Sequence, residues 1–303
     1  MIDALAEYLS AQTETTVEVH SSRRVPGGDT RAMFDVDTSA GRLLVRIERG
    51  GVFGTSSDPE VGLMQSLHAA GFPVAEVRWF EPTGKVLGQP FFVMNYIEAD
   101  RLGDDQPVDE ATAAAFVRSL AALHALQPTA HLPAVDPAQS THILIEHWRN
   151  VGKSTGAPRV PLLDSAEMWL HQNAPITSRV SLVHGDAGPS NMVSANGEVV
   201  VLTDWELGHV GDPSEDWSNC MSIRGSQAMP RDAWRALFES EAGVKMSNEQ
   251  WSYWEAFNLY KAACADRSCL GLFESGRNRS PDLAIIATAR HHTYLRRLVD
   301  LIK

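Results

Sequence analysis

The sequence predicts an α+β fold in two unequal lobes, a small lobe built on an antiparallel sheet and a larger, mainly helical lobe. Short strand-like runs separated by glycine-bearing turns dominate the first part of the 303-residue chain. From about residue 111 onward, apolar residues recur mainly every three or four positions, as in amphipathic helices. The polar stretch from Asp100 to Asp109 is expected to connect the two lobes, which gives predicted domains of 1–97 and 98–303.

The first lobe is predicted to begin with a helix over residues 1–12. Strands are then expected at 17–19, 32–37, 43–47, 74–80 and 90–97. A helix is expected to start at Asp58-Pro59, where Asp caps the first turn and Pro takes the first helical position.

The second lobe is predicted to contain helices at 111–126, 143–151 and 162–172, with a Pro- and Ala-rich surface loop over 127–140. After Trp217 the pattern is helical to the end, with breaks near Gly225, Pro230, Gly243 and Gly276.

Composition is typical of a globular enzyme, with 44% hydrophobic and 21% charged residues. A formal charge of -12 argues against broad binding of nucleic acid or of anionic membranes. The N-terminus lacks a signal peptide pattern, and there is no run of apolar residues long enough to span a membrane, so we expect a cytoplasmic protein.

Candidate chemistry is concentrated between Leu182 and Ser218. His184-Gly185-Asp186 is followed by Asn191, a predicted hairpin turning at Asn196-Gly197, and then Asp204. The hairpin would bring Asn191 and Asp204 together beside Asp186. Carboxylate and amide oxygens are hard ligands, so the set suits Mg²⁺ better than zinc.

The segments HGDAGPSN and LTDWELGHVGDPSEDW resemble the aminoglycoside phosphotransferase and choline kinase superfamily, which has a protein-kinase-like fold. The resemblance is strongest to its DWE-motif branch, which includes kinase-like domains fused to acyl-CoA dehydrogenases. It implies that Asp186 is the catalytic base and that Asn191 and Asp204 hold the metal. It further implies that His184 orients the catalytic loop and that Asp216 anchors it.

The same resemblance implies a nucleotide site in the first lobe. Gly27-Gly28 would lie over the triphosphate, although a plain turn is an equal alternative. Arg46 takes the place of the usual phosphate-binding lysine, with an exposed sheet residue as the alternative. Glu60 is expected to pair with it from the following helix.

The adenine is expected to hydrogen-bond to backbone atoms where the last strand of the first lobe ends. Asn95, Tyr96 and Ile97 are the residues predicted there. Such a site depends on backbone geometry, so side-chain identity gives little signal.

The predicted function is therefore transfer of the γ-phosphoryl group of ATP, with Mg²⁺, to a hydroxyl of a small molecule. A hydroxyacyl-CoA and an amino-alcohol or aminoglycoside remain open as acceptors. The alternative is a catalytically silent nucleotide-binding or scaffold protein of the same fold. We interpret the aromatic group Trp251, Tyr253, Trp254 and Phe257 as core packing. The alternative is an aromatic box that binds a quaternary ammonium group by cation–π contacts.

Overall fold

The computed structural model describes residues 1–25, 31–48, 56–98, 100–101, 106–127 and 131–303. The chain divides into two compact units, Met1–Glu98 and Ala99–Lys303. The first contains an antiparallel sheet and two helices, and the second is mainly helical. This confirms the predicted α+β class, with its small antiparallel-sheet part and larger helical part.

The first unit is organised on a five-stranded antiparallel sheet with strand order β1-β2-β3-β5-β4. Its elements are α1 (Ile2–Thr13), β1 (Val19–Arg24), β2 (Arg31–Thr38), β3 (Gly41–Glu48), α2 (Ser57–Ala69), β4 (Val77–Glu81) and β5 (Phe91–Asn95). The register opposes Arg46 of β3 to Phe92 of β5, so Arg46 lies on a central strand.

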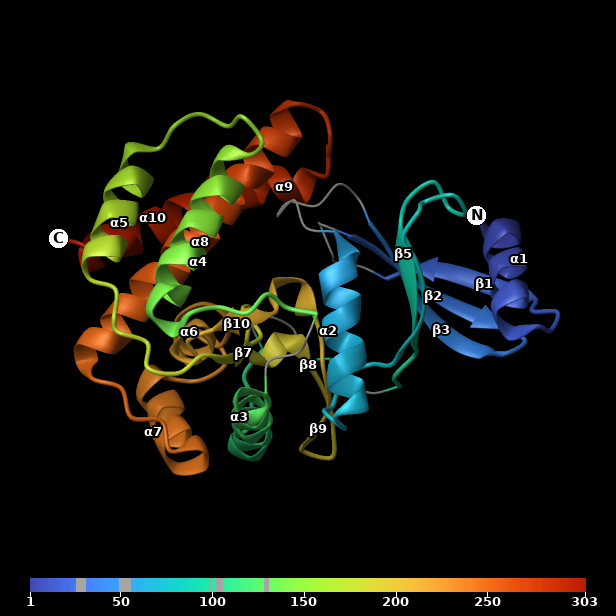
Figure 1. Cartoon of the computed structure of the whole chain (residues 1–303), viewed down its shortest axis with the longest axis horizontal. Helices are drawn as coiled ribbons and strands as arrows, with labels where there is room; N and C mark the ends of the chain where they lie inside the picture. Colours follow the sequence, from blue (N-terminus) through green and yellow to red (C-terminus); the bar gives the residue numbers. More distant parts are fainter. Residues whose placement is uncertain (26–30, 49–55, 99, 102–105, 128–130) are drawn as a thin grey trace. The chain divides into compact units, whose positions relative to one another are not determined.

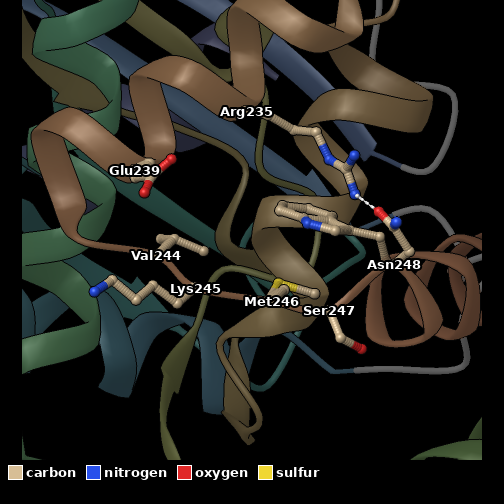
Figure 2. Close-up of a pocket in the computed structure, with 8 residues that line it drawn as sticks. Arg235, Glu239, Val244, Lys245, Met246, Ser247 and Asn248 are labelled. Atoms are coloured by element: carbon tan, nitrogen blue, oxygen red, sulfur yellow. Dashed lines mark hydrogen bonds between the residues drawn. The ribbon is translucent and has the colours of Figure 1, made fainter.

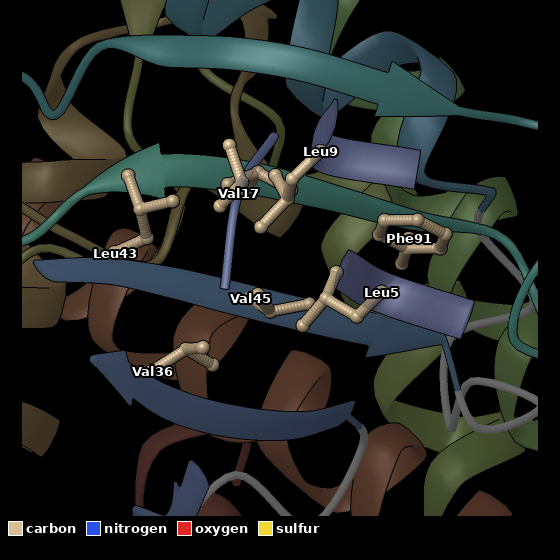
Figure 3. Packing of buried hydrophobic residues seen from close by; sticks show 8 residues of the cluster. Leu5, Leu9, Val17, Val36, Leu43, Val45 and Phe91 are labelled. Atoms are coloured by element: carbon tan, nitrogen blue, oxygen red, sulfur yellow. The ribbon is translucent and has the colours of Figure 1, made fainter. Parts of the chain in front are cut away.

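The core of this unit lies where α1 covers the sheet. Leu5 and Leu9, one helical turn apart, pack in one cluster with Val45 and Phe91 of the central strands (Figure 3). Since all four side chains are almost fully buried, the hydrophobic effect holds α1 on the sheet.

One boundary in this unit differs from the prediction. Helix α2 starts at Ser57, so Asp58 and Pro59 fall inside its first turn. The backbone N–H of Ser57 donates to the carboxylate of Glu48, at the end of β3. A carboxylate from a neighbouring strand thus caps this helix, which a local sequence pattern cannot indicate.

In the second unit, the long helix α8 (Asn248–Glu274) packs against α4 (Pro137–Lys153), α5 (Pro161–Gln172) and α10 (His291–Leu301), which surround it in Figure 1. The other helices of the described chain here are α3 (Glu110–Ala125), α6 (Ser214–Asn219), α7 (Arg231–Ala242) and α9 (Pro281–Ile285), with π-helical turns at Cys220–Arg224 and Ile286–Arg290.

Short strands in this unit form two small sheets. Strand β7 (Ser181–Val183) pairs with β10 (His209–Gly211), and β6 (Asp100–Arg101) pairs with the hairpin β8 (Met192–Ala195) and β9 (Glu198–Leu202). The predicted connector from Asp100 therefore begins as an edge strand of the second unit.

Helix α4 begins at Pro137, six positions before the predicted start at Ile143 and inside the predicted loop. The carboxylate of Asp136 accepts the backbone N–H of Ala138, and proline suits the first helical position. The loop prediction was wrong at this end because the helix start signal lies within Pro- and Ala-rich sequence.

Candidate active site

The predicted catalytic loop leaves β7 and places Asp186 at a partly open position, with 14% of its side chain exposed. Gly185 has a φ of +79°, and a Cβ there would lie 2.3 Å from the carbonyl oxygen of Leu207. Glycine is therefore required at this position both by conformation and by the close approach of the Leu207 backbone.

Asp216, at the start of α6, anchors this loop. Its buried carboxylate accepts the backbone N–H groups of His184 (2.8 Å) and Gly185 (2.9 Å) and lies 2.9 Å from Nε2 of His124. Burial alone would raise the pKa of Asp216, but the hydrogen bond with His124 and the charge of nearby histidines lower it overall. The anchoring contacts are those implied for Asp216 by the resemblance.

The side chain of His184 connects the loop to the end of the hairpin. Its Nε2 lies 2.9 Å from the carbonyl oxygen of Thr203, which can only accept, so Nε2 carries the proton. Its Nδ1 then accepts the backbone N–H of Asp186 at 3.3 Å. His184 thus positions Asp186 relative to the residue that precedes Asp204.

The β8–β9 hairpin brings the two predicted metal ligands to one end. Asn196 and Gly197 both have positive φ, as the tight turn requires. At the other end the backbone N–H of Thr203 donates to the carbonyl oxygen of Asn191 at 2.9 Å, so Asp204 directly follows the residue paired with Asn191.

Asn191 also touches Asp186. Its Nδ2 donates to the backbone carbonyl (2.9 Å) and to Oδ2 (3.2 Å) of Asp186. Because the amide nitrogen is used in this way, Oδ1 of Asn191 is the atom that could bind a cation.

Asp204 has a left-handed backbone, with φ 67° and ψ 59°. Such a conformation is uncommon outside glycine, asparagine and aspartate, and residues held in it are concentrated at functional sites. The following residue, Trp205, is buried and stacks at a tilt on His184 with ring centroids 4.6 Å apart. The buried indole fixes the chain immediately after Asp204.

Arg224 forms an ion pair with Asp186 that the sequence analysis did not predict. Its Nε lies 2.8 Å from Oδ1, and its Nη2 bonds to Oδ2. Arg224 ends the π-helical turn after α6, 38 positions along the chain from Asp186. No local motif marks this residue, so its role depends on tertiary structure.

Lys261 of α8 is a second residue that the sequence analysis missed. Its buried Nζ donates to the carbonyl oxygen of Gly185 at 2.6 Å and to Glu215 at 2.7 Å. Burial would raise the pKa of Glu215, but the charges of Lys261 and His209 lower it overall. The sequence does contain one indication of this role, because a lysine within the largely apolar segment 251–264 is expected to be buried only with a partner.

In the first unit, Arg46 and Glu60 form a buried ion pair, with Nη1 and Oε1 2.7 Å apart. The predicted contact between Arg46 on the strand and Glu60 on the helix is therefore present in the structure. A buried pair is strongly destabilised when one partner is removed, because the other charge is left without compensation.

The predicted adenine-binding residues lie at the end of β5, with Asn95 as its last residue and Tyr96 and Ile97 directly after it. The side chain of Asn95 bonds to Glu76 at 2.6 Å, and the ring of Tyr96 lies under the guanidinium of Arg42. Ile97 is half-buried at the end of this unit. Gly27 and Gly28, the predicted triphosphate loop, lie outside the described residues.

The aromatic group on α8 is buried, with Trp251, Tyr253, Trp254 and Phe257 all less than a tenth exposed. The hydroxyl of Tyr253 donates to the carbonyl of Leu170 at 3.1 Å. These contacts fit core packing and leave no open box for an ammonium group.

A cavity of about 440 Å³ lies at the connection from α7 to α8 (Figure 2). Arg235 donates to Asn248 at 3.1 Å on its edge and lies over the ring of Trp251. Its lining contains none of the predicted catalytic or metal-binding residues.

A carboxylate cluster separate from the predicted metal site lies on α4 and α5, formed by Glu146, Glu167 and His171. Arg149 bonds to both glutamates, so one guanidinium group offsets part of the negative charge of this cluster.

The fold and the sequence both place this chain in a family of phosphotransferases. Residues 21–247 match the model of the phosphotransferase enzyme family, and the chain belongs to that family. Solved structures share the protein-kinase-like fold of these enzymes. One is a choline kinase from Streptococcus pneumoniae (TM-score 0.71, 15% identity, covering 98% of both chains). Another is a protein described as an aminoglycoside phosphotransferase from Ralstonia eutropha JMP134 (TM-score 0.74, 21% identity, covering 99% of this chain and 97% of that one).

Curated relatives are larger proteins. Acyl-CoA dehydrogenase family member 10 of Mus musculus is 25% identical over 296 residues, which cover 86% of this chain and 27% of the relative. Family member 11 of Mus musculus is 25% identical over 262 residues, covering 76% and 33%. The chain thus spans about a third or less of the length of these relatives, and the resemblance to this branch is confirmed.

Across the part of the chain that the structure describes, no helix has both the length and the apolar character needed to cross a membrane.

Proposed function

We propose that this protein is a small-molecule kinase that transfers the γ-phosphoryl group of ATP to an alcohol. The observation that carries the proposal is the placement of Asp186, Asn191 and Asp204. One anchored loop and one hairpin hold these three residues at the same end of a small sheet. Family membership supports the reaction class.

Asn191 Oδ1 and the carboxylate of Asp204 would hold Mg²⁺, because both are hard oxygen donors at the open end of the hairpin. Bound magnesium would offset charge on the phosphate oxygens during transfer. Arg46, held by Glu60, would pair with phosphate oxygens of the nucleotide.

Asp186 would orient the acceptor hydroxyl and take up its proton as the oxygen attacks phosphorus. The carboxylate position is fixed by Asn191 on one side, and the backbone is fixed by His184 and Asp216. Such preorganisation is the main contribution a protein makes to phosphoryl transfer.

The test incubates the protein with ATP, Mg²⁺ and a metabolite extract, and follows new phosphorylated species by mass spectrometry. Asp186→Asn should reduce their formation roughly a hundredfold to ten-thousandfold while nucleotide affinity is retained. The exposed Asp232→Asn on α7 is the matched control and should leave formation unchanged. Equal product from Asp186→Asn and the parent would refute the assignment.

A catalytically silent nucleotide-binding protein is the second candidate. It is favoured by the bidentate ion pair of Arg224 with Asp186, which engages both carboxylate oxygens. Absence of any phosphorylated species that depends on Asp186 would support it.

A further inference from the structure

The guanidinium group of Arg224 lies beside Asp186 and is built into the fold. A Cβ on Gly188 would lie 2.1 Å from Cβ of Arg224, so the catalytic loop can lie against Arg224 only with glycine at this position. The π-helical turn that ends at Arg224 is closed by a backbone hydrogen bond, which the N–H of Gly225 donates to the carbonyl oxygen of Cys220. Arg224 is therefore held at Asp186 by its backbone as well as by its charge.

A second guanidinium group belongs to the same neighbourhood. Arg290, 44% exposed, bonds to the buried carboxylate of Asp266 at 2.6 Å. Burial raises the pKa of Asp266 to about 6, and the charges of Arg290 and Arg224 both act to lower it. The pKa of Tyr294, raised by burial, is likewise influenced by Arg224, Arg290 and Asp186. The guanidinium of Arg290 also lies over the ring of Tyr294, 5.9 Å from its centroid. The two ion pairs and this tyrosine, namely Asp186, Arg224, Asp266, Arg290 and Tyr294, are called here the acceptor cluster.

The lone pairs of Asp186 decide how an acceptor can bind. A carboxylate oxygen accepts about two hydrogen bonds. Among the described residues, Oδ2 accepts from Arg224 and Asn191, whereas Oδ1 accepts one bond, from Nε of Arg224. An acceptor hydroxyl can therefore donate to Oδ1 while Arg224 stays in place, and the group next to that hydroxyl would then face the guanidinium.

We propose that Arg224 selects an acceptor with an anionic group near the reacting hydroxyl, a carboxylate or a phosphate, and disfavours amino-alcohols and aminoglycosides. This rests on the proposed function and narrows its acceptor class. Both carboxylates of the acceptor cluster are already bonded to guanidinium groups, so a substrate ammonium would have to displace a guanidinium group to pair with either of them. An anion would gain charge-assisted bonds from Arg224, and the half-open Arg290 adds a second cation.

The experiment measures binding by titration calorimetry to protein loaded with Mg²⁺ and a non-hydrolysable ATP analogue, so that the nucleotide site is filled. The anionic probes are hydroxybutyrate, glycerol phosphate and hydroxybutyryl-coenzyme A. Their anionic groups are, in that order, a free carboxylate, a phosphate ester and the phosphates of coenzyme A, which are remote from the hydroxyl. Choline and kanamycin are the cationic probes. Variants are Arg224→Gln, Arg224→Lys and the control Arg159→Gln, whose side chain is 75% exposed on another surface.

We expect at least one anionic probe to bind more tightly than both cationic probes. Arg224→Gln should weaken that binding roughly tenfold or more, and Arg224→Lys should restore part of it, because lysine keeps the charge without the planar fork. Arg159→Gln should have no effect. The preference of the unaltered protein is informative even if Arg224→Gln fails to fold.

Tighter binding of choline or kanamycin, no anion binding at millimolar concentration, or anion affinity indifferent to Arg224→Gln would each overturn the inference. The proposed kinase function fails separately, through the absence of phosphorylated product that depends on Asp186. A cationic alcohol phosphorylated with that dependence would leave the function standing and refute the acceptor class.

Discussion

Gly185 and Gly197 have nearly the same positive φ, +79° and +78°, but different surroundings. A Cβ on Gly185 would meet the backbone of Leu207, whereas a Cβ on Gly197 would have nothing within 4 Å. An alanine at Gly197 would therefore introduce backbone strain alone, whereas an alanine at Gly185 would introduce the same strain and a steric clash with Leu207.

We predict that Gly185→Ala reduces phosphoryl transfer at least roughly tenfold, because the loop carrying Asp186 must shift. Gly197→Ala should cost about 1 kcal/mol of stability through strain alone and leave turnover near the parent level. Steady-state kinetics and urea unfolding of both variants provide the measurement. Equal turnover in the two variants would show that the Leu207 contact does not position Asp186.

At the scale of elements, the sheet of the first unit is tied together by the carboxylate of Asp35 on β2. It accepts hydrogen bonds from Arg42 of β3 at 2.8 Å and from Arg23 of β1 at 3.0 Å. The hydrogen bond from Arg42 lowers the pKa of Asp35 from 3.8 to about 2, and Arg23 adds to this against the opposing effect of burial.

This lowered pKa predicts a pH dependence of stability. The ionised form is favoured in the folded state, so the contribution is present above pH 3.8 and is lost as pH falls toward 2. It should amount to about 1 kcal/mol, since both arginines are partly exposed and screened by solvent.

Asp35→Asn should therefore lower the free energy of unfolding by about 1 kcal/mol at pH 7 and have a smaller effect near pH 2. The exposed Asp37→Asn on the same strand is the control. Urea unfolding at the two pH values is the measurement, and an effect of Asp35→Asn that is independent of pH would contradict the prediction.

At the scale of the molecule, each of the two units has its own buried side chains. The hydrophobic core that α1 covers consists entirely of residues of the first unit. Leu9 is 1% exposed in that core, whereas Ile2 on the same helix is 43% exposed. The pair allows the stability of one unit to be changed without altering the chemistry of the other.

Leu9→Ala should destabilise the first unit by about 2 to 5 kcal/mol, and Ile2→Ala by much less. In native-state hydrogen exchange we expect the amides of β2, β3 and β5 to lose protection and those of α8 to keep it. Loss of protection in α8 to the same extent would show that the units unfold as one.

Much of the candidate site could be predicted because its geometry is local. Asn191, the Asn196-Gly197 turn and Asp204 lie within one hairpin, and a two-residue turn fixes which residues return to the same end. Helices α3 and α5 were predicted to within a residue or so, because their apolar spacing agrees with clear start and stop signals. The start of α2 was misplaced, because its first backbone N–H bonds to Glu48 on the preceding strand and the helix begins at Ser57.

The sequence by itself determined the α+β fold class, through hydrophobic periodicity and turn chemistry, and the family, through the resemblance carried by HGDAGPSN and LTDWELGHVGDPSEDW. It also placed the predicted catalytic and metal-binding residues around one hairpin, because a two-residue turn is a local feature. The tertiary structure alone decided which distant side chains hold and surround Asp186. His124 is 92 positions from Asp216, and Lys261 is 76 positions from Gly185. Arg224 reaches Asp186 through a π-helical turn and the missing side chain of Gly188. Contacts between residues so far apart depend on how helices pack, and no local pattern in the chain encodes that packing.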